Sequence, residues 1–222
     1  MTLTLEEMYN MQKELDAKIV AEKGLEGQDL LYKRTLALQI ELAECANEYR
    51  GFKFWSDRSE PKHGYDALIE CPKCSGKGFW FSGERVICGR CDEKGKITNP
   101  LLEEFVDCVH FFLSIAGQYG WLDALYISED AIEETRDEGL DGEVTGAFLE
   151  SMYWLMKFHM ERDRDEKIEQ KLGKTKREMC FRNAWYVFFA IGLVGFNFTF
   201  EQIADAYAAK NKVNHERQVN GY

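Results

Sequence analysis

The chain has 222 residues, of which 45% are hydrophobic, and its formal net charge is −11. This length allows one sizeable core with a small insert, and the negative charge excludes a general electrostatic attraction to nucleic acid. An acidic chain can still bind a polyphosphate if its carboxylates hold divalent cations. No signal-peptide pattern opens the sequence, and the longest apolar run, residues 184–196, is shorter than a membrane span. We therefore expect a cytoplasmic protein with no membrane partner.

The spacing of apolar residues predicts an all-α helical bundle. Helices are expected over residues 4–23, 28–56, 101–117, 143–165 and 176–192, with a short acidic helix inside 121–139 and a last helix starting at Thr199. Residues 79–87 are the one stretch typical of a β-hairpin. We expect the core to comprise residues 1–58 and 99–222, interrupted by a zinc-binding module at residues 59–98.

The segment "CPKCSGKGFWFSGERVICGRC" carries two Cys-x-x-Cys pairs, Cys71 with Cys74 and Cys88 with Cys91. This spacing is typical of a structural zinc site, whose four sulfurs leave no open position for catalysis. Disulfides or free thiols are the alternatives. The stretch "CPKCSGKG" resembles a repeat of J-domain chaperones, which supports a zinc fold but not chaperone activity. From Cys71 to Lys96, six basic residues stand against three acidic ones, whereas the rest of the chain is strongly acidic.

Two of the predicted helices each carry a pair of carboxylates three residues apart. Glu41 and Glu44 fall on one helix face, with no Lys or Arg three or four residues later to pair with them. Glu104 and Asp107 lie on a helix that is apolar almost all round, where an unpaired carboxylate is costly. The two pairs predict an oxygen cage for two or more Mg²⁺ ions, completed by phosphates. A solvated acidic edge is the alternative.

The predicted last helix carries a polar stripe that spans about 120° of its surface. Lys and Arg suit phosphate oxygens, whereas amides and Tyr suit a sugar or a base. A solvated tail is the alternative, but the clustering of amides with two cations favours a ligand. The stripe consists of Tyr207, Lys210, Asn211, Asn214, Arg217 and Gln218.

Four motifs, in this order, resemble the dimeric all-α dUTPase family, within the all-α nucleotide pyrophosphohydrolase superfamily. They are "MQKEL", "ELAECANEYRGFKFWS", "EEFVDCVHFFLS" and "YAAKNKVNHERQVNGY". The resemblance implies a homodimer that hydrolyses dUTP to dUMP and pyrophosphate with Mg²⁺. The cysteine segment lies between the second and third motifs and is not a general feature of that family. Leu15 stands where some members carry Asn.

The resemblance also implies roles for single residues. Four carboxylates would carry Mg²⁺: Glu41, Glu44, Glu104 and Asp107. Glu41 or Glu44 would orient or deprotonate the attacking water. Residues near the C-terminus would bind the substrate: Lys210, Asn211, Asn214, Arg217 and Tyr222. Gln12 and Trp55 would line the uracil pocket, and His110 would contact the nucleoside.

Several alternatives remain open at this point. A related pyrophosphohydrolase would act on another base, such as that of dCTP. A zinc-bearing interaction protein would have no activity at all. The insert itself could bind nucleic acid or a regulatory protein, although its small positive balance gives this little support. The aromatic stretches 148–158 and 184–196 are candidates for the dimer interface because they need burial.

Overall fold

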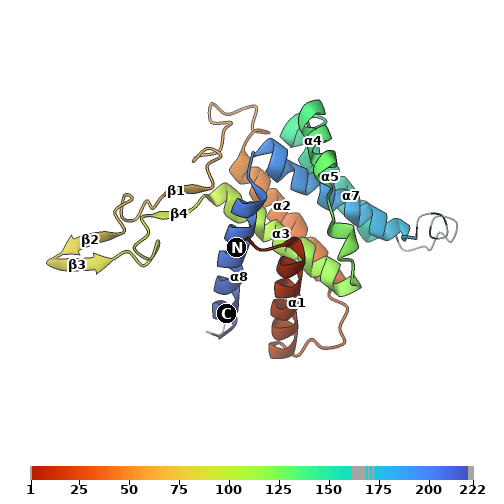
Figure 1. Ribbon diagram of the computed structural model, residues 1–222, viewed down its shortest axis with the longest axis horizontal. Coiled ribbons are helices and arrows are strands. Elements are labelled where there is room, and N and C mark those ends of the chain that lie inside the picture. Colours follow the sequence, from red (N-terminus) through yellow and green to blue (C-terminus); the bar gives the residue numbers. More distant parts are fainter. Residues whose placement is uncertain (1, 162–168, 170, 172, 220–222) are drawn as a thin grey trace.

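A computed structural model of the chain describes residues 2–161, 169, 171 and 173–219. It confirms the predicted all-α core with a small insert (Figure 1). The helices are α1 (Leu5–Glu22), α2 (Leu31–Tyr49), α3 (Pro100–Tyr119), α4 (Glu129–Glu138), α5 (Glu143–Met160), α7 (Lys176–Ala190) and α8 (Phe200–Val219). A 3-10 turn, η1 (Asp123–Leu125), precedes α4, and a π-helical turn, η2 (Ile191–Gly195), continues α7.

Local capping signals fix where several helices begin. The Thr4 side chain accepts a hydrogen bond from the Glu7 amide at 3.2 Å, and the Glu7 carboxylate accepts one from the Thr4 amide at 2.7 Å. The Asn99 side chain caps α3 by accepting a hydrogen bond from the Leu101 amide at 3.1 Å, and Pro100 follows at the first helical position. Thr199 accepts a hydrogen bond from the Gln202 amide at 3.1 Å and thereby starts α8. These side chains account for the predicted starts at residues 4, 101 and 199.

Two predicted helices end earlier than the sequence pattern indicated. α2 stops at Tyr49 rather than residue 56, because Arg50 takes a left-handed backbone conformation with φ of 68°. The ring of Tyr49 then folds over Gly51, where any side chain would overlap it. α5 stops at Met160, and Glu161 is extended. Residues 162–165 of the predicted helix lie outside the described residues.

The core surrounds α3, whose apolar residues are buried along most of its length. The Phe105 ring stacks on Phe188 of α7 at 4.5 Å between centroids. Gly192 in η2 packs against Phe105 so closely that a side chain there would clash. Residues 184–191 are buried inside the chain apart from Tyr186 and Val187. This stretch of the proposed dimer interface thus needs no partner to cover it, contrary to our reasoning from burial.

Within the described residues, no single helix has both the length and the apolar composition that a membrane span requires. Residues 176–195 and 200–218 reach these values only when taken together, and the two segments are bent by 113° with respect to each other.

The insert joins the end of α2 to the start of α3 and projects from the helical body (Figure 1). Strands β1 (Leu68–Glu70) and β4 (Lys96–Thr98) pair antiparallel and form its base. Strands β2 (Phe79–Ser82) and β3 (Glu84–Ile87) form the predicted hairpin, with Gly83 in the turn. The base strands were not predicted, because three residues are too few to show an alternating pattern. All four strands lie between residues 59 and 98, and those two boundaries stay a prediction.

Candidate active site

Three carboxylates from two helices converge at one point on the side of the bundle. Glu41 lies on α2, and Glu104 and Asp107 lie one turn apart on α3. One oxygen from each of them lies within 4.8 Å of the others. Oxygens that share one Mg²⁺ at 2.0–2.1 Å lie about 3–4 Å apart, so a small contraction would bring the three onto one ion. The donor set therefore fits a hard divalent cation.

The electrostatics of the cluster favour the uptake of positive charge. Burial, and then the charges of Asp107 and Glu44, raise the pKa of Glu41 to about 7. Burial and the charges of Asp107, Glu44 and Glu41 raise the pKa of Glu104 to about 7. The pKa of Asp107 is also raised, chiefly by burial. A bound cation would offset both the burial and the mutual repulsion that raise the pKa values of these groups.

Lys210 of α8 is the cation that faces this cluster most closely. Its Nζ lies 2.5 Å from Oδ2 of Asp107 and 3.4 Å from Oε1 of Glu103. Its charge lowers the pKa of Glu41, Glu104 and Asp107, but burial and the other carboxylates outweigh this effect. The predicted role of Lys210 was phosphate binding, and in the structure its ammonium contacts two carboxylates of α3 instead.

Glu44 differs from the other three predicted magnesium ligands, because it is exposed. It lies close enough to raise the pKa of both Glu41 and Glu104. It is not one of the three residues whose oxygens meet within 4.8 Å. Glu44 therefore stands at the solvent edge of the cluster, where it can act on a ligand from outside.

A hydrogen-bonded network around Gln12 lies beside the cluster. The Gln12 side-chain amide donates to Asp16 Oδ1 at 2.9 Å, and its oxygen accepts from the Tyr207 hydroxyl at 3.1 Å. Asp16 also accepts from the Ser114 hydroxyl at 2.6 Å and forms an ion pair with Arg34 at 3.3 Å. Sequence reasoning identified Gln12 and placed Tyr207 on the stripe, but it missed Asp16, which follows Gln12 by one helical turn.

His110 is held in one tautomer by the same network. Its Nδ1 lies 2.7 Å from Gln12 Oε1, which can only accept, so Nδ1 carries the proton. Nε2 is then a bare acceptor, and it is buried without a hydrogen-bond partner among the described residues. Burial and the charge of Lys210 lower the pKa of His110 to about 3, so the ring is neutral. Its ring also stacks on Tyr207 at 4.2 Å between centroids.

The remaining predicted substrate-binding residues differ in how far they are buried. Asn211 is buried one turn beyond Tyr207, Asn214 is half-buried, and Arg217 is exposed, although its charge still lowers the pKa of Asp107. Trp55 lies in the turns after α2 with 65% of its surface exposed, so no pocket encloses it in this chain alone. Tyr222 lies outside the described residues.

The four predicted zinc ligands come together at the foot of the hairpin. Cys71 and Cys88 have their sulfurs 3.8 Å apart, and Cys74 and Cys91 have theirs 3.6 Å apart. A disulfide would need about 2 Å. Sulfurs bound to one tetrahedral zinc at 2.3 Å would lie about 3.8 Å apart. The cluster can therefore hold a metal such as zinc. The Gly78 amide also donates a hydrogen bond to the Cys74 sulfur at 3.1 Å.

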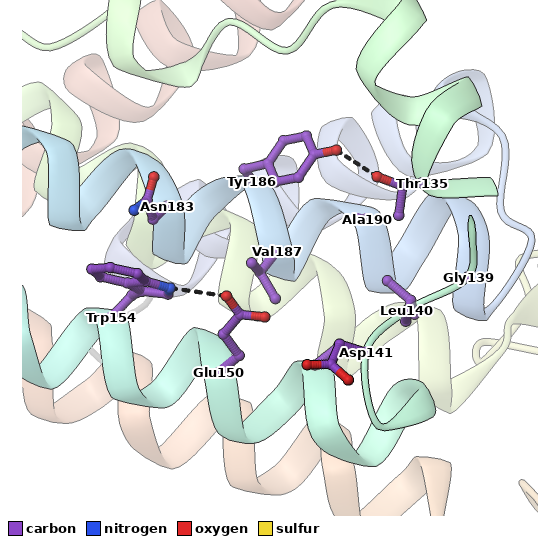
Figure 2. Close-up of a pocket in the computed structure, with 11 residues that line it drawn as sticks. Thr135, Gly139, Leu140, Asp141, Glu150, Trp154, Asn183, Tyr186, Val187 and Ala190 are labelled. Atoms are coloured by element: carbon purple, nitrogen blue, oxygen red, sulfur yellow. Dashed lines mark hydrogen bonds between the residues drawn. The ribbon is translucent and has the colours of Figure 1, made fainter. Parts of the chain in front are cut away.

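A separate pocket of about 320 Å³ lies between α4, α5 and α7 (Figure 2). Thr135 and Tyr186 are joined across it by a hydrogen bond of 2.5 Å, and the Trp154 indole donates to Glu150 at 3.0 Å. Its lining includes Asp141 and Glu150 but no Lys or Arg among the described residues. The pocket is therefore unsuited to a triphosphate, and it contains none of the predicted site residues.

Comparison with known proteins gives one clear match. The model of a family described as dUTPase matches residues 4–71 and 92–222. The internal stretch that is not matched, residues 72–91, holds three of the four clustered cysteines and the whole hairpin. A search of curated proteins found no match. Because the match covers most of the chain, includes every helix and spans all three converging carboxylates, this chain belongs to the all-α dUTPase family.

Proposed function

We propose that this chain is a Mg²⁺-dependent dUTP diphosphatase, which hydrolyses dUTP to dUMP and pyrophosphate. The observation that carries the proposal is the convergence of Glu41, Glu104 and Asp107 in a chain of the dUTPase family. The family supports hydrolysis of a nucleotide pyrophosphate bond. The choice of dUTP and of Mg²⁺ is our proposal, supported by the family and by a donor set made only of carboxylate oxygens.

In this proposal, Glu41, Glu104 and Asp107 hold Mg²⁺, and Glu44 completes the site from its exposed edge. Magnesium would supply charge neutralisation at the phosphates and activation of the attacking water. Glu41 or Glu44 orients that water and accepts its proton. Glu44 is exposed and is not one of the three carboxylates whose oxygens converge. It can therefore contact a water molecule before the substrate binds, as a general base must.

The chain supplies separate groups for the two ends of the substrate. Lys210 already neutralises Asp107 and would move to a phosphate oxygen when magnesium occupies the carboxylates. Asn211, Asn214, Arg217 and Tyr222 would extend this contact along the triphosphate. Toward the base, Gln12 can donate its second amide hydrogen and His110 can accept at Nε2. Trp55 would cover the base from the exposed turn after α2.

We also propose that the protein is a homodimer that pairs through α2 and α5. On α2, Tyr32, Leu36 and Ile40 are exposed at 50% or more. On α5, four more large apolar side chains at helical spacing are exposed: Leu149, Tyr153, Met156 and Met160. The Tyr32 ring meets His159 of α5 at 5.1 Å, so the two stripes form one apolar face. Such a face is typical of an interface between copies.

The substrate proposal is tested by the release of pyrophosphate from a panel of deoxynucleoside triphosphates with Mg²⁺. We expect dUTP to be turned over with a kcat/KM at least about a hundredfold above that for dCTP or dTTP, because buried polar groups reject a base that leaves them unpaired. A higher kcat/KM for dCTP would replace the substrate. The absence of turnover with every triphosphate would leave a zinc-bearing interaction protein as the better account.

A further inference from the structure

The β2–β3 hairpin exposes one aromatic face that the dUTPase activity does not use. Phe79 and Phe81 lie on the same side of β2 and are paired with Ile87 and Arg85 of β3. Phe81 is 73% exposed, and Ile87 is 52% exposed. The two Phe rings meet edge to face at 5.6 Å, and the Arg85 guanidinium lies 4.5 Å from the centre of the Phe79 ring. The exposed Phe81 and Ile87 side chains, next to the half-buried Phe79 ring on a projecting hairpin, indicate a contact surface.

The opposite face of the hairpin is anchored on the cysteine cluster. Trp80 packs against the four clustered cysteines, and the Lys73 ammonium lies 5.1 Å from the centre of its ring. A groove of about 560 Å³ lies along β2 and is lined by residues of both faces, among them Lys73, Ser75, Lys77 and the three aromatic residues of β2. The cysteine cluster thus anchors the β2 strand that carries the Phe rings, and an anchored strand lowers the entropic cost of binding.

The cations of this segment are available to a ligand. Arg85 forms an ion pair with Glu93 at 3.0 Å. Lys77, Arg90, Lys94 and Lys96 are exposed, and none of them forms an ion pair within the described residues. Six basic residues stand against three acidic ones between residues 71 and 96, in a chain whose net charge is −11. The hairpin is therefore a basic and aromatic surface on an acidic protein.

We propose that this surface binds single-stranded nucleic acid. Exposed rings beside unpaired cations are suited to a strand whose bases stack and whose phosphates face Lys and Arg. A duplex would keep its bases stacked on one another and would leave Phe81 in water. An acidic polypeptide would satisfy the cations but not the rings. The proposal is independent of dUTP hydrolysis, because no residue of the hairpin belongs to the carboxylate cluster or to the network around Gln12.

The acidic body does not prevent this contact. Its charge is screened over about 8 Å at physiological salt, and the hairpin projects away from the helices (Figure 1). A bound strand would therefore meet the positive field of the module first. Binding should be local and short, and it should weaken with salt. With three phosphate contacts, the logarithm of the binding constant should fall with a slope of about −2 against the logarithm of the salt concentration.

The test is fluorescence anisotropy of labelled fifteen-nucleotide oligo(dT) and oligo(U) with the full zinc-loaded chain. Phe81→Ala should weaken binding between about 5-fold and about 150-fold, since stacking contributes ~1–3 kcal/mol per base. Lys77→Glu combined with Lys94→Glu should weaken binding and flatten the salt dependence. The matched controls are Tyr126→Ala, another exposed aromatic residue, and Lys33→Glu, an exposed lysine on α2; both should bind as the wild type does.

Zinc content and helical circular dichroism of each variant establish that it is folded. Comparison of oligo(dT) with oligo(U) shows whether DNA or RNA is preferred, and either preference supports the proposal. No binding to either strand at low salt would overturn it. Equal affinity for a duplex of the same length, or displacement of the strand by polyglutamate at equal charge, would also overturn it. The proposal would also be overturned if Phe81→Ala bound the strand as tightly as Tyr126→Ala does.

Discussion

Neutralising one carboxylate of the cluster should stabilise the metal-free fold while it abolishes activity. The substitution is Glu104→Gln, which keeps the shape of the side chain and removes its charge. The folded-state pKa of Glu104, about 7, lies above its ordinary value of 4.5. The stability that this group contributes is therefore present below about pH 4.5 and is lost as the pH rises through 7. At pH 8 the wild-type chain carries the full cost of the ionised carboxylate, and the Gln variant does not.

The size of the effect follows from that difference in pKa. Each tenfold change in proton affinity corresponds to ~1.4 kcal/mol, so a fully buried group would contribute ~3.4 kcal/mol. Glu104 is only half-buried, and solvent screening reduces this to about 1–2 kcal/mol. For a chain of this length, the midpoint of thermal unfolding should rise by about 2–8 °C. At pH 5 the difference between variant and wild type should be much smaller.

The assay is scanning calorimetry at pH 5 and pH 8 in magnesium-free buffer without a chelator, so that the cysteine cluster stays intact. The matched control is Glu133→Gln on the exposed side of α4, which should shift the midpoint at neither pH. Added Mg²⁺ at ten times its Kd should stabilise the wild type by ~1.4 kcal/mol and the Glu104→Gln variant far less. The reasoning is refuted if Glu104→Gln unfolds at the wild-type temperature at pH 8, or if magnesium stabilises both chains equally.

Three further predictions concern other parts of the molecule. Lys210→Met should raise KM for dUTP by about tenfold or more, since it would remove the charged contact to phosphate that we propose. Steady-state kinetics decides, and an unchanged KM contradicts the proposal. Cys74→Ser should lose one zinc per chain by native mass spectrometry yet keep its helical circular dichroism; full zinc retention would refute the four-sulfur site. Leu36→Glu should convert a dimer into a monomer by light scattering, whereas Tyr126→Glu should not; a monomeric wild type contradicts the proposed face.

The parts of the fold that local chemistry decides were predictable from the sequence. The side chains of Thr4, Asn99 and Thr199 cap their helices by accepting hydrogen bonds from backbone amides two or three residues later, so the residue type at the cap position is enough to predict them. The end of α2 is different. It occurs where Arg50 takes a left-handed backbone conformation, which the continuing helical pattern beyond residue 49 conceals. The short base strands of the insert are fixed by pairing across the cysteine knot, which no local pattern reveals.

The candidate site was predictable as a set of carboxylates but not as an arrangement. The i, i+3 spacing identified Glu41, Glu104 and Asp107, and the structure brings them together. The same spacing could not show that Glu44 is exposed, because the rotation of α2 about its axis is set by packing against α3. The contacts of Gln12 with His110, and of Asp16 with Ser114, join positions 98 residues apart, so only the folded chain reveals them. The roles in substrate binding stay predictions.

The central claim is that these carboxylates hold the magnesium that dUTP hydrolysis requires. The most direct measurement is pyrophosphate release from dUTP over a magnesium titration, for the wild type and Glu41→Gln side by side. The account predicts that wild-type turnover depends on Mg²⁺ and saturates with it, and that Glu41→Gln loses at least about a hundredfold in kcat with its helices intact. Turnover without any divalent cation, or full activity of the folded Glu41→Gln variant, would contradict it.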